Sequence, residues 1–202
     1  EKNALKNLNN PTFSQNKSNN QVRINGGSLR GKKIIFSNTS GLRPTGNRIK
    51  ETLFNWIRQH VQHSNCLDLF SGSGSLGIES ISHGARSVTM IEKNHFAFLA
   101  IKNSCERLNI KNITIIEADA IKWISGENNG ATFDLVFLDP PFMSDLVPVC
   151  CEILEKNKLL SSPCHIYVET TKKEKGLCVP ENWILLKDKV AGQVAYKLYV
   201  RN

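Results

Sequence analysis

Leu67-Asp68-Leu69-Phe70-Ser71-Gly72-Ser73-Gly74-Ser75-Leu76-Gly77 is the stretch that decides the fold of this chain. An apolar run ends in an acid, a tight glycine turn follows, and Leu76 and Ile78 begin a helical pattern. The glycines fit the spacing G-x-G-x-x-G after a strand, which lets the backbone approach a ligand closely. The stretch therefore predicts a strand, a ligand-binding turn and a helix, in that order.

Strand-like and helix-like runs alternate through the rest of the chain. The strand-like runs are 65–70, 87–92, 112–117 and 133–138, with later strands expected at 164–169, 183–188 and 194–200. Helical patterns lie at about 75–83, 95–108, 119–125 and 145–158. Alternation with short connections predicts an α/β fold: a doubly wound, seven-stranded, mostly parallel sheet with an antiparallel C-terminal hairpin.

The N-terminal part divides into a polar tail and a small basic extension. Residues 1–20 include seven asparagines and little that could pack, so a disordered tail is expected there. Residues 21–61 are expected to form a hairpin between Val22 and Phe36, then a helix from an N-cap at Thr45 to about Val61. The main domain is predicted to span residues 62–202.

The net charge of +8 is concentrated ahead of the glycine turn. Residues 21–60 hold eight basic residues and one acidic residue, whereas residues 61–202 hold 15 basic and 16 acidic ones. A one-sided basic segment is typical of nucleic-acid binding. The alternative is a generic solvated surface, which the steepness of the local excess disfavours.

The cysteines and the hydropathy pattern argue against a metal-binding protein and against a membrane protein. The chain has six cysteines and five histidines but no C-x-x-C pair and no metal-like spacing, so we expect reduced thiols and no metal site. No apolar run approaches the roughly 18 residues that a membrane span needs, and no signal-peptide pattern is present. A cytoplasmic protein without membrane contact is expected.

Acids stand at or just past the ends of four consecutive predicted strands. They are Asp68, Glu92, Asp119 and Asp139. Ligands of open α/β sheets bind outside the carboxyl ends of the strands, so these acids favour a ligand that carries positive charge. S-adenosylmethionine fits, since it has an ammonium, a sulfonium and no phosphate; Glu92 would hold its ribose hydroxyls. Each acid could instead be only a helix N-cap, and this alternative is strongest for Asp119.

Two motifs together resemble a known enzyme class. Asp68-x-Phe70-x-Gly72-x-Gly74, followed by Asp139-Pro140-Pro141-Phe142, resembles the Rossmann-like class I amino methyltransferases that modify N6 or N2 positions. Arg23-Ile24-x-Gly26-Gly27-x-Leu29-Arg30-Gly31-Lys32, with Leu42-Arg43-Pro44-Thr45 and Arg48-x-Lys50-Glu51, narrows the resemblance to the RsmD-type 16S rRNA guanine-N2 methyltransferases. The resemblance runs from Val22 to the C-terminus, with Asn47, Ser71 and Ser75 as mild departures.

The resemblance implies both a reaction and a set of roles. It implies methyl transfer from S-adenosylmethionine to N2 of one guanine, guanine 966, in 16S rRNA, within the small ribosomal subunit or an assembly intermediate, by a monomer. The catalytic residues would be Asp139, Pro140 and Phe142. The cofactor-binding residues would be Asp68, Phe70, Ser71, Gly72, Gly74, Glu92, Asp119 and Ala120. The RNA-binding residues would be Arg23, Arg30, Lys32, Lys33, Arg43 and Arg48.

The chemistry of guanine N2 explains the Asp-Pro-Pro-Phe tetrad. The amino nitrogen is a poor nucleophile because its lone pair is delocalised into the ring. The Asp139 carboxylate and the Pro140 carbonyl can each accept one N–H, which frees the lone pair, while Phe142 stacks on the base. Catalysis is then mainly positioning and electrostatics. A paired guanine could not enter, so the base must be unpaired or flipped out.

Two other functions remain open at the level of sequence. An NAD-dependent oxidoreductase would use the same glycine turn but leaves Asp68, the tetrad and the basic extension unexplained. An RNA-binding ribosome assembly factor with a silent cofactor pocket would use only the basic extension. The tetrad itself could also be a plain Asp-Pro turn after a strand.

Overall fold

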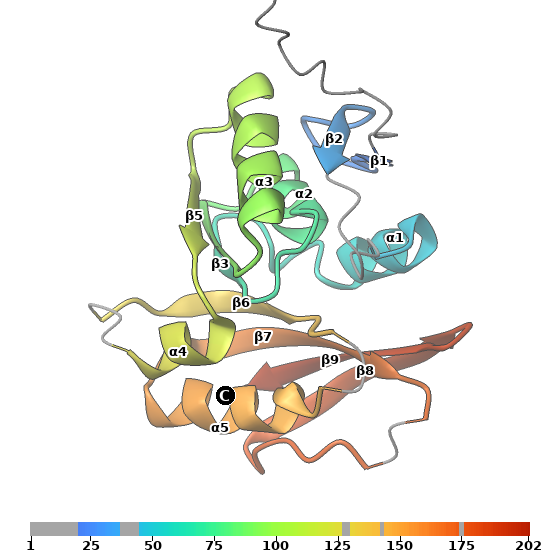
Figure 1. The fold of residues 1–202 in the computed structure, drawn as a ribbon. Coiled ribbons are helices and arrows are strands. Elements are labelled where there is room, and N and C mark those ends of the chain that lie inside the picture. The colour runs from blue at the N-terminus through green and yellow to red at the C-terminus, as the bar shows by residue number, and fades with distance from the viewer. Residues whose placement is uncertain (1–19, 37–44, 127–129, 142–143, 174–175) are drawn as a thin grey trace, which may run out of the picture.

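The computed structural model describes residues 20–36, 45–126, 130–141, 144–173 and 176–202 (Figure 1). A seven-stranded sheet forms its centre, in the order β5-β4-β3-β6-β7-β9-β8. The strands are β3 (Asn65–Asp68), β4 (Ser87–Glu92), β5 (Ile113–Glu117), β6 (Phe133–Leu138), β7 (Leu160–Thr171), β8 (Trp183–Ala191) and β9 (Val194–Arg201). Strands β3 to β7 pair in parallel with their neighbours among these five, and β9 pairs antiparallel with both β7 and β8. The predicted fold class is confirmed.

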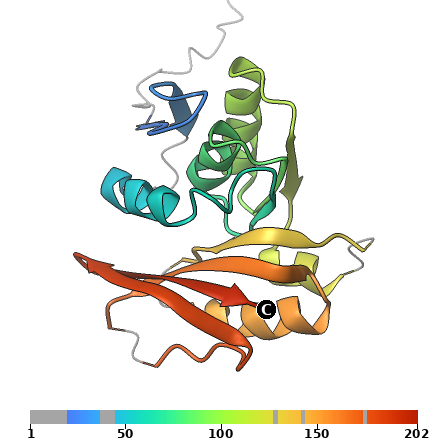
Figure 2. The same ribbon diagram turned by 180° about the vertical axis from the view of Figure 1, so that it is seen from behind.

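Helices cover both faces of this sheet (Figures 1 and 2). The helices are α1 (Asn47–Trp56), α2 (Ser75–Ser82), α3 (His95–Arg107), α4 (Ala120–Ser125) and α5 (Leu146–Lys156). One buried cluster joins α1, α2 and α3 to one face, and a second joins α4 and α5 to the other. In β6, Leu135 and Phe137 belong to the first cluster, whereas Val136 and Leu138 belong to the second. The strand is therefore an apolar run, because both of its faces are buried.

The strand order reverses between β3 and β6. The chain passes from β3 to β4 and β5 on one side, and then returns to place β6 on the other side of β3. In open α/β sheets, a crevice forms at the carboxyl ends of the strands beside such a reversal. The acids at residues 68 and 139 stand on the two strands that flank it, at the end of β3 and just past the end of β6.

The N-terminal hairpin, β1 (Asn20–Arg23) with β2 (Lys33–Phe36), is anchored to the main domain by a buried ion pair. Glu79 of α2 accepts from the backbone N–H groups of Asn25 and Gly26, each at 2.8 Å, and pairs with the Lys50 ammonium at 3.3 Å. The Lys50 ammonium also donates to the carbonyl oxygen of Arg23 at 2.9 Å. Because both charged side chains are fully buried, Lys50 serves the packing of the extension and presents no charge to solvent.

The helix after the hairpin differs from its prediction at both ends. The N-cap is Gly46, and no side chain caps the helix; the hydroxyl of Thr45 donates instead to Asp139. The helix ends at Trp56, after which the chain turns tightly, although Val61 is buried as its apolar spacing predicts. The N-cap prediction for Thr45 was wrong because a carboxylate distant in sequence competes for its hydroxyl.

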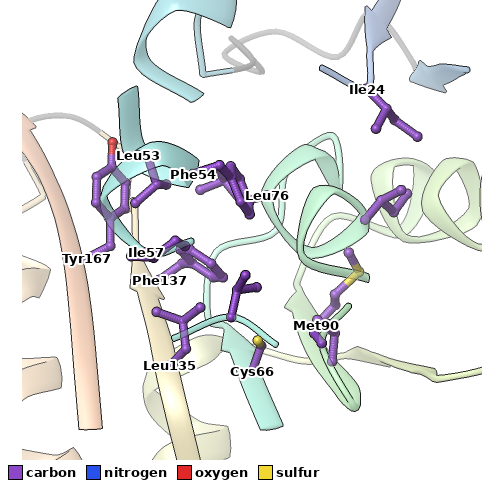
Figure 3. Packing of buried hydrophobic residues seen from close by; sticks show 14 of the residues in the cluster. Ile24, Leu53, Phe54, Ile57, Cys66, Leu76, Met90, Leu135, Phe137 and Tyr167 are labelled. Carbon is purple, nitrogen blue, oxygen red and sulfur yellow. The ribbon is translucent and has the colours of Figure 1, made fainter. Parts of the chain in front are cut away.

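α1 packs its apolar face against the sheet. Figure 3 shows Leu53, Phe54 and Ile57 in one cluster with Leu135 and Phe137 of β6. The rings of Phe54 and Phe137 lie 6.4 Å apart. This contact fixes the start of α1, and with it Thr45, above the carboxyl end of β6. The described residues contain no helix that is both long and apolar enough to cross a membrane.

Candidate active site

The glycine turn joins β3 to α2 as the spacing predicts. Gly74 is the N-cap of α2 and has a φ of 77°, a conformation that side chains with a Cβ rarely adopt. At Gly77, an added Cβ would lie 2.2 Å from Cε of Met90 on β4, so α2 packs closely on the sheet. Gly74 therefore allows the chain to turn from the loop into α2, while Gly77 allows the helix to pack closely on β4.

Asp68 lies beneath this loop at the end of β3, with only 2% of its surface exposed. Its carboxylate accepts from the N–H of Gly77 at 3.1 Å, and its carbonyl accepts from the hydroxyl of Ser71 at 3.0 Å. Burial, followed by the negative charge of Asp139, raises the pKa of the Asp68 carboxyl to about 7. The fold thus holds an acid where a neighbouring cation would favour its ionised form.

Glu92 connects the glycine loop to the next strand. One carboxylate oxygen accepts from the N–H of Gly72 at 2.8 Å, and the other accepts from the N–H of Asn94 at 2.7 Å. Each oxygen keeps a free lone pair, so the carboxylate can also accept from two hydroxyl groups. The predicted position at the end of β4 is confirmed, and its carboxylate suits a ribose diol.

Asp119 is the N-cap of α4, as the alternative interpretation held. Its side chain accepts from the N–H of Lys122 at 3.2 Å. Ala120 is buried at the first position of the helix. A cofactor contact of either residue stays a prediction, as does a cofactor contact of Phe70, which is half-buried in the glycine loop.

Asp139 directly follows β6 at the strand reversal. Its carboxylate accepts from the hydroxyl of Thr45 at 3.1 Å. Burial raises the pKa of the Asp139 carboxyl to about 6, and the Thr45 hydrogen bond opposes that rise. Pro140 is buried beside it. Phe142, the predicted stacking residue, lies outside the described residues.

A further acid that the sequence analysis did not single out, Glu169, lies near the carboxyl end of β7. Glu169 is 3% exposed and its carboxylate accepts from the hydroxyl of Tyr167 at 2.7 Å. Burial, then the charge of Asp139, raises the pKa of Glu169 to about 8. Its signal in the sequence is the same as that of Asp68 and Glu92: an acid closes the apolar run Ile166-Tyr167-Val168.

The comparisons with known proteins agree with this geometry. A family model described as conserved hypothetical protein 95 matches residues 22–200. A protein named ribosomal RNA small subunit methyltransferase D from Escherichia coli K12 is 40% identical, over 90% of this chain and 90% of its own length. The relative of that name from Buchnera aphidicola is 39% identical over 96% and 98%. The chain belongs to the ribosomal RNA small subunit methyltransferase D family.

Solved structures of similar proteins have the same fold as this chain. The structure of yhhF from Escherichia coli superposes with a TM-score of 0.81 at 38% identity, covering 91% of this chain and 99% of its own. A methyltransferase solved with SAH reaches a TM-score of 0.66 at 13% identity, so that likeness concerns the fold alone. In this family member, the strand reversal and the glycine loop therefore lie within a fold that methyltransferases use.

The donor set at the reversal fits S-adenosylmethionine, the cofactor of this methyltransferase. Burial and the negative charges of Asp139 and Glu92 raise the pKa of the Asp68 carboxyl group at the end of β3. A sulfonium and an ammonium would relieve this repulsion, whereas the phosphates of a dinucleotide would add to it. Among the described residues, no group of His, Cys, Asp and Glu could hold a metal ion.

The basic residues predicted to bind RNA lie at the surface of the N-terminal extension. Arg23, Arg30, Lys32, Lys33 and Arg48 are all exposed, and Arg43 lies outside the described residues. Glu79 and Lys50 anchor the backbone of the hairpin that carries four of these residues to α2 of the main domain. The structure thus shows that these five basic side chains are accessible, and their contact with RNA stays a prediction.

Proposed function

We propose that this chain transfers the methyl group of S-adenosylmethionine to the exocyclic N2 of a guanine in 16S rRNA. The observation that carries the proposal is Asp139 with Pro140, held at the reversal between β3 and β6 by the Thr45 hydroxyl. Membership of the methyltransferase D family supports the substrate class. The buried acids of the crevice support a cationic methyl donor rather than a dinucleotide.

The residues of the crevice prepare the amino group for attack. S-adenosylmethionine supplies, when bound, a methyl carbon activated by a sulfonium sulfur. The Asp139 carboxylate and the Pro140 carbonyl oxygen each accept one N–H of the guanine amino group, so its lone pair faces the methyl carbon. The N–C bond forms as the C–S bond breaks, and the Asp139 carboxylate takes the proton that N2 loses. Positioning and fixed charge supply most of the acceleration.

The protein must also bring a guanine to this crevice. N2 lies on the pairing edge of the base, so the target is unpaired or turned out of its helix, with Phe142 stacking on its face. Arg23, Arg30 and Lys32 contact phosphates, which orients the RNA without reading its sequence. We propose that the protein acts as a monomer on a small subunit or an assembly intermediate.

Labelling with a radioactive methyl group tests the proposal. Small subunits that lack the modification, the same RNA free of protein and double-stranded DNA are each incubated with the enzyme and labelled S-adenosylmethionine. The account predicts N2-methylguanosine as the only labelled nucleoside, from RNA alone, with the subunit preferred. Label on adenine, or wild-type RNA binding without any transfer, would contradict it and would favour another amino methyltransferase or a silent assembly factor.

A further inference from the structure

Glu169 stands beside the proposed catalytic aspartate. Strands β6 and β7 pair in parallel, with Phe137 opposite Tyr167 and Leu138 opposite Val168. The next position along this register brings Asp139 beside Glu169, about one strand spacing away, roughly 5 Å between backbones. The proposed mechanism gives Glu169 no role, yet the fold buries its carboxyl group at the reacting end of the sheet.

One hydroxyl group joins the two acids. Thr45 donates to the Asp139 carboxylate at 3.1 Å, and the same hydroxyl also hydrogen-bonds the carboxyl group of Glu169. A hydroxyl has one proton and can donate it to only one acceptor at a time. If both acids were ionised, they would compete for that proton. If Glu169 is protonated, its O–H donates to the Thr45 oxygen and the Thr45 proton is committed to Asp139.

We propose that Glu169 is a positioning residue whose protonated carboxyl group donates to Thr45, so that Thr45 holds Asp139 as an ionised acceptor aimed at the guanine amino group. This inference rests on the proposed function, since it gives the acceptor role to Asp139. In this arrangement Glu169 donates to Thr45 and Thr45 donates to Asp139, so each hydrogen bond has one donor and one acceptor. Tyr167 also donates to Oε1 of the Glu169 carboxyl group at 2.7 Å.

The surroundings of Glu169 favour its protonated form. Tyr167 faces it on its own strand, Tyr196 lies opposite on β9, and Asp139 and Thr45 complete its neighbours. Lys189 on β8 lies one strand further out and is exposed. In the part of the chain that the structure describes, Glu169 forms no ion pair. Burial and the charge of Asp139 raise the pKa of Glu169 to about 8, while its hydrogen bonds with Tyr167 and Thr45 oppose that rise. Because Glu169 is 3% exposed and Asp139 is half-buried, we place the proton that the two acids share at neutral pH on Glu169.

The pH dependence of single-turnover methyl transfer tests this arrangement. The wild-type rate should fall as pH rises through about 8, since an ionised Glu169 draws the Thr45 proton away from Asp139. In Glu169→Gln, the amide still donates to Thr45 and accepts from Tyr167, and it does not titrate. This variant should keep a neutral-pH rate within about threefold of wild type and should lose the alkaline fall.

Two further variants separate positioning from folding. Thr45→Val should transfer about tenfold more slowly because Asp139 loses an oriented hydrogen bond, and Thr45→Ser should restore the rate. Binding of S-adenosylmethionine should be unchanged in all three variants. An alkaline fall that persists unchanged in Glu169→Gln, or wild-type transfer by Thr45→Val, would overturn the inference. Absence of guanine methylation by the wild-type enzyme would instead overturn the proposed function.

Discussion

The substitution Asp68→Asn should stabilise the free protein at alkaline pH. Asp68 is 2% exposed, and its pKa is about 7 in the fold against 3.8 ordinarily. Since the folded pKa is the higher one, the folded state binds more protons than the unfolded state between these values. Stability is therefore lost as pH rises from about 4 to about 7, and the full loss, roughly 4 kcal/mol, is present above pH 7.

An asparagine at position 68 escapes this loss but carries its own cost. Its oxygen can still accept from the N–H of Gly77, whereas its buried amide N–H groups lack the water they would have in the unfolded chain, at about 1–3 kcal/mol. That cost does not depend on pH. At pH 5.5 the wild-type loss is only about half complete, so the advantage of the variant over wild type should grow by about 2 kcal/mol between pH 5.5 and pH 8.5.

Urea denaturation of the free protein at the two pH values measures this difference. Asp145→Asn is the matched control, because it makes the same change of charge at an exposed side chain. In thermal unfolding at pH 8.5, the midpoint temperature of Asp68→Asn should exceed that of wild type by roughly 4–8 °C for a chain of this length. A difference in unfolding free energy that is equal at both pH values would refute the argument that Asp68 is held partly protonated. The same variant should bind S-adenosylmethionine more weakly and release fewer protons on binding.

Two further predictions concern the N-terminal extension. Glu79→Ala should lower the free energy of unfolding by about 3–5 kcal/mol, because it leaves the buried Lys50 ammonium without its partner. The double variant Glu79→Leu with Lys50→Met should recover much of that loss in urea denaturation. An equal loss of unfolding free energy in the single and the double variant would contradict the anchoring role. Lys32→Ala should weaken RNA binding and reduce the slope of log affinity against log salt by about 0.7–0.9. Lys156→Ala on α5, which removes an exposed charge elsewhere, should change neither quantity. Equal effects of the two substitutions would mean that the basic extension does not contact RNA.

The sequence predicted most of the sheet because its signals are local. β4 and β6 have the predicted bounds, since each is an apolar run closed by an acid. β7 is longer than predicted: it begins at Leu160 and includes Ser161, Ser162 and Pro163, which carry no strand-like pattern. Its pairing with β6 and β9, rather than its composition, extends it.

The contacts that the sequence did not predict join residues far apart in the chain. Thr45 has the local appearance of an N-cap, and only the folded sheet brings Asp139 to its hydroxyl. Lys50 counts as a basic surface residue until Glu79 is placed beside it. Glu169 ends an apolar run as the other acids do, yet its partnership with Asp139 depends on the parallel register of β6 and β7. Such pairings follow from topology, which periodicity alone does not fix.

The comparison of Asp139→Asn with wild type tests the central claim most directly, by single-turnover methyl transfer to unmodified small subunits and by calorimetric binding of S-adenosylmethionine. Asparagine keeps the size of the side chain and its hydrogen bond from Thr45 but removes the charge that orients the guanine amino group. The account predicts a rate about 100- to 1,000-fold lower, with cofactor affinity within about threefold of wild type. Transfer at the wild-type rate, or a loss of cofactor affinity large enough to explain the slower transfer, would contradict it.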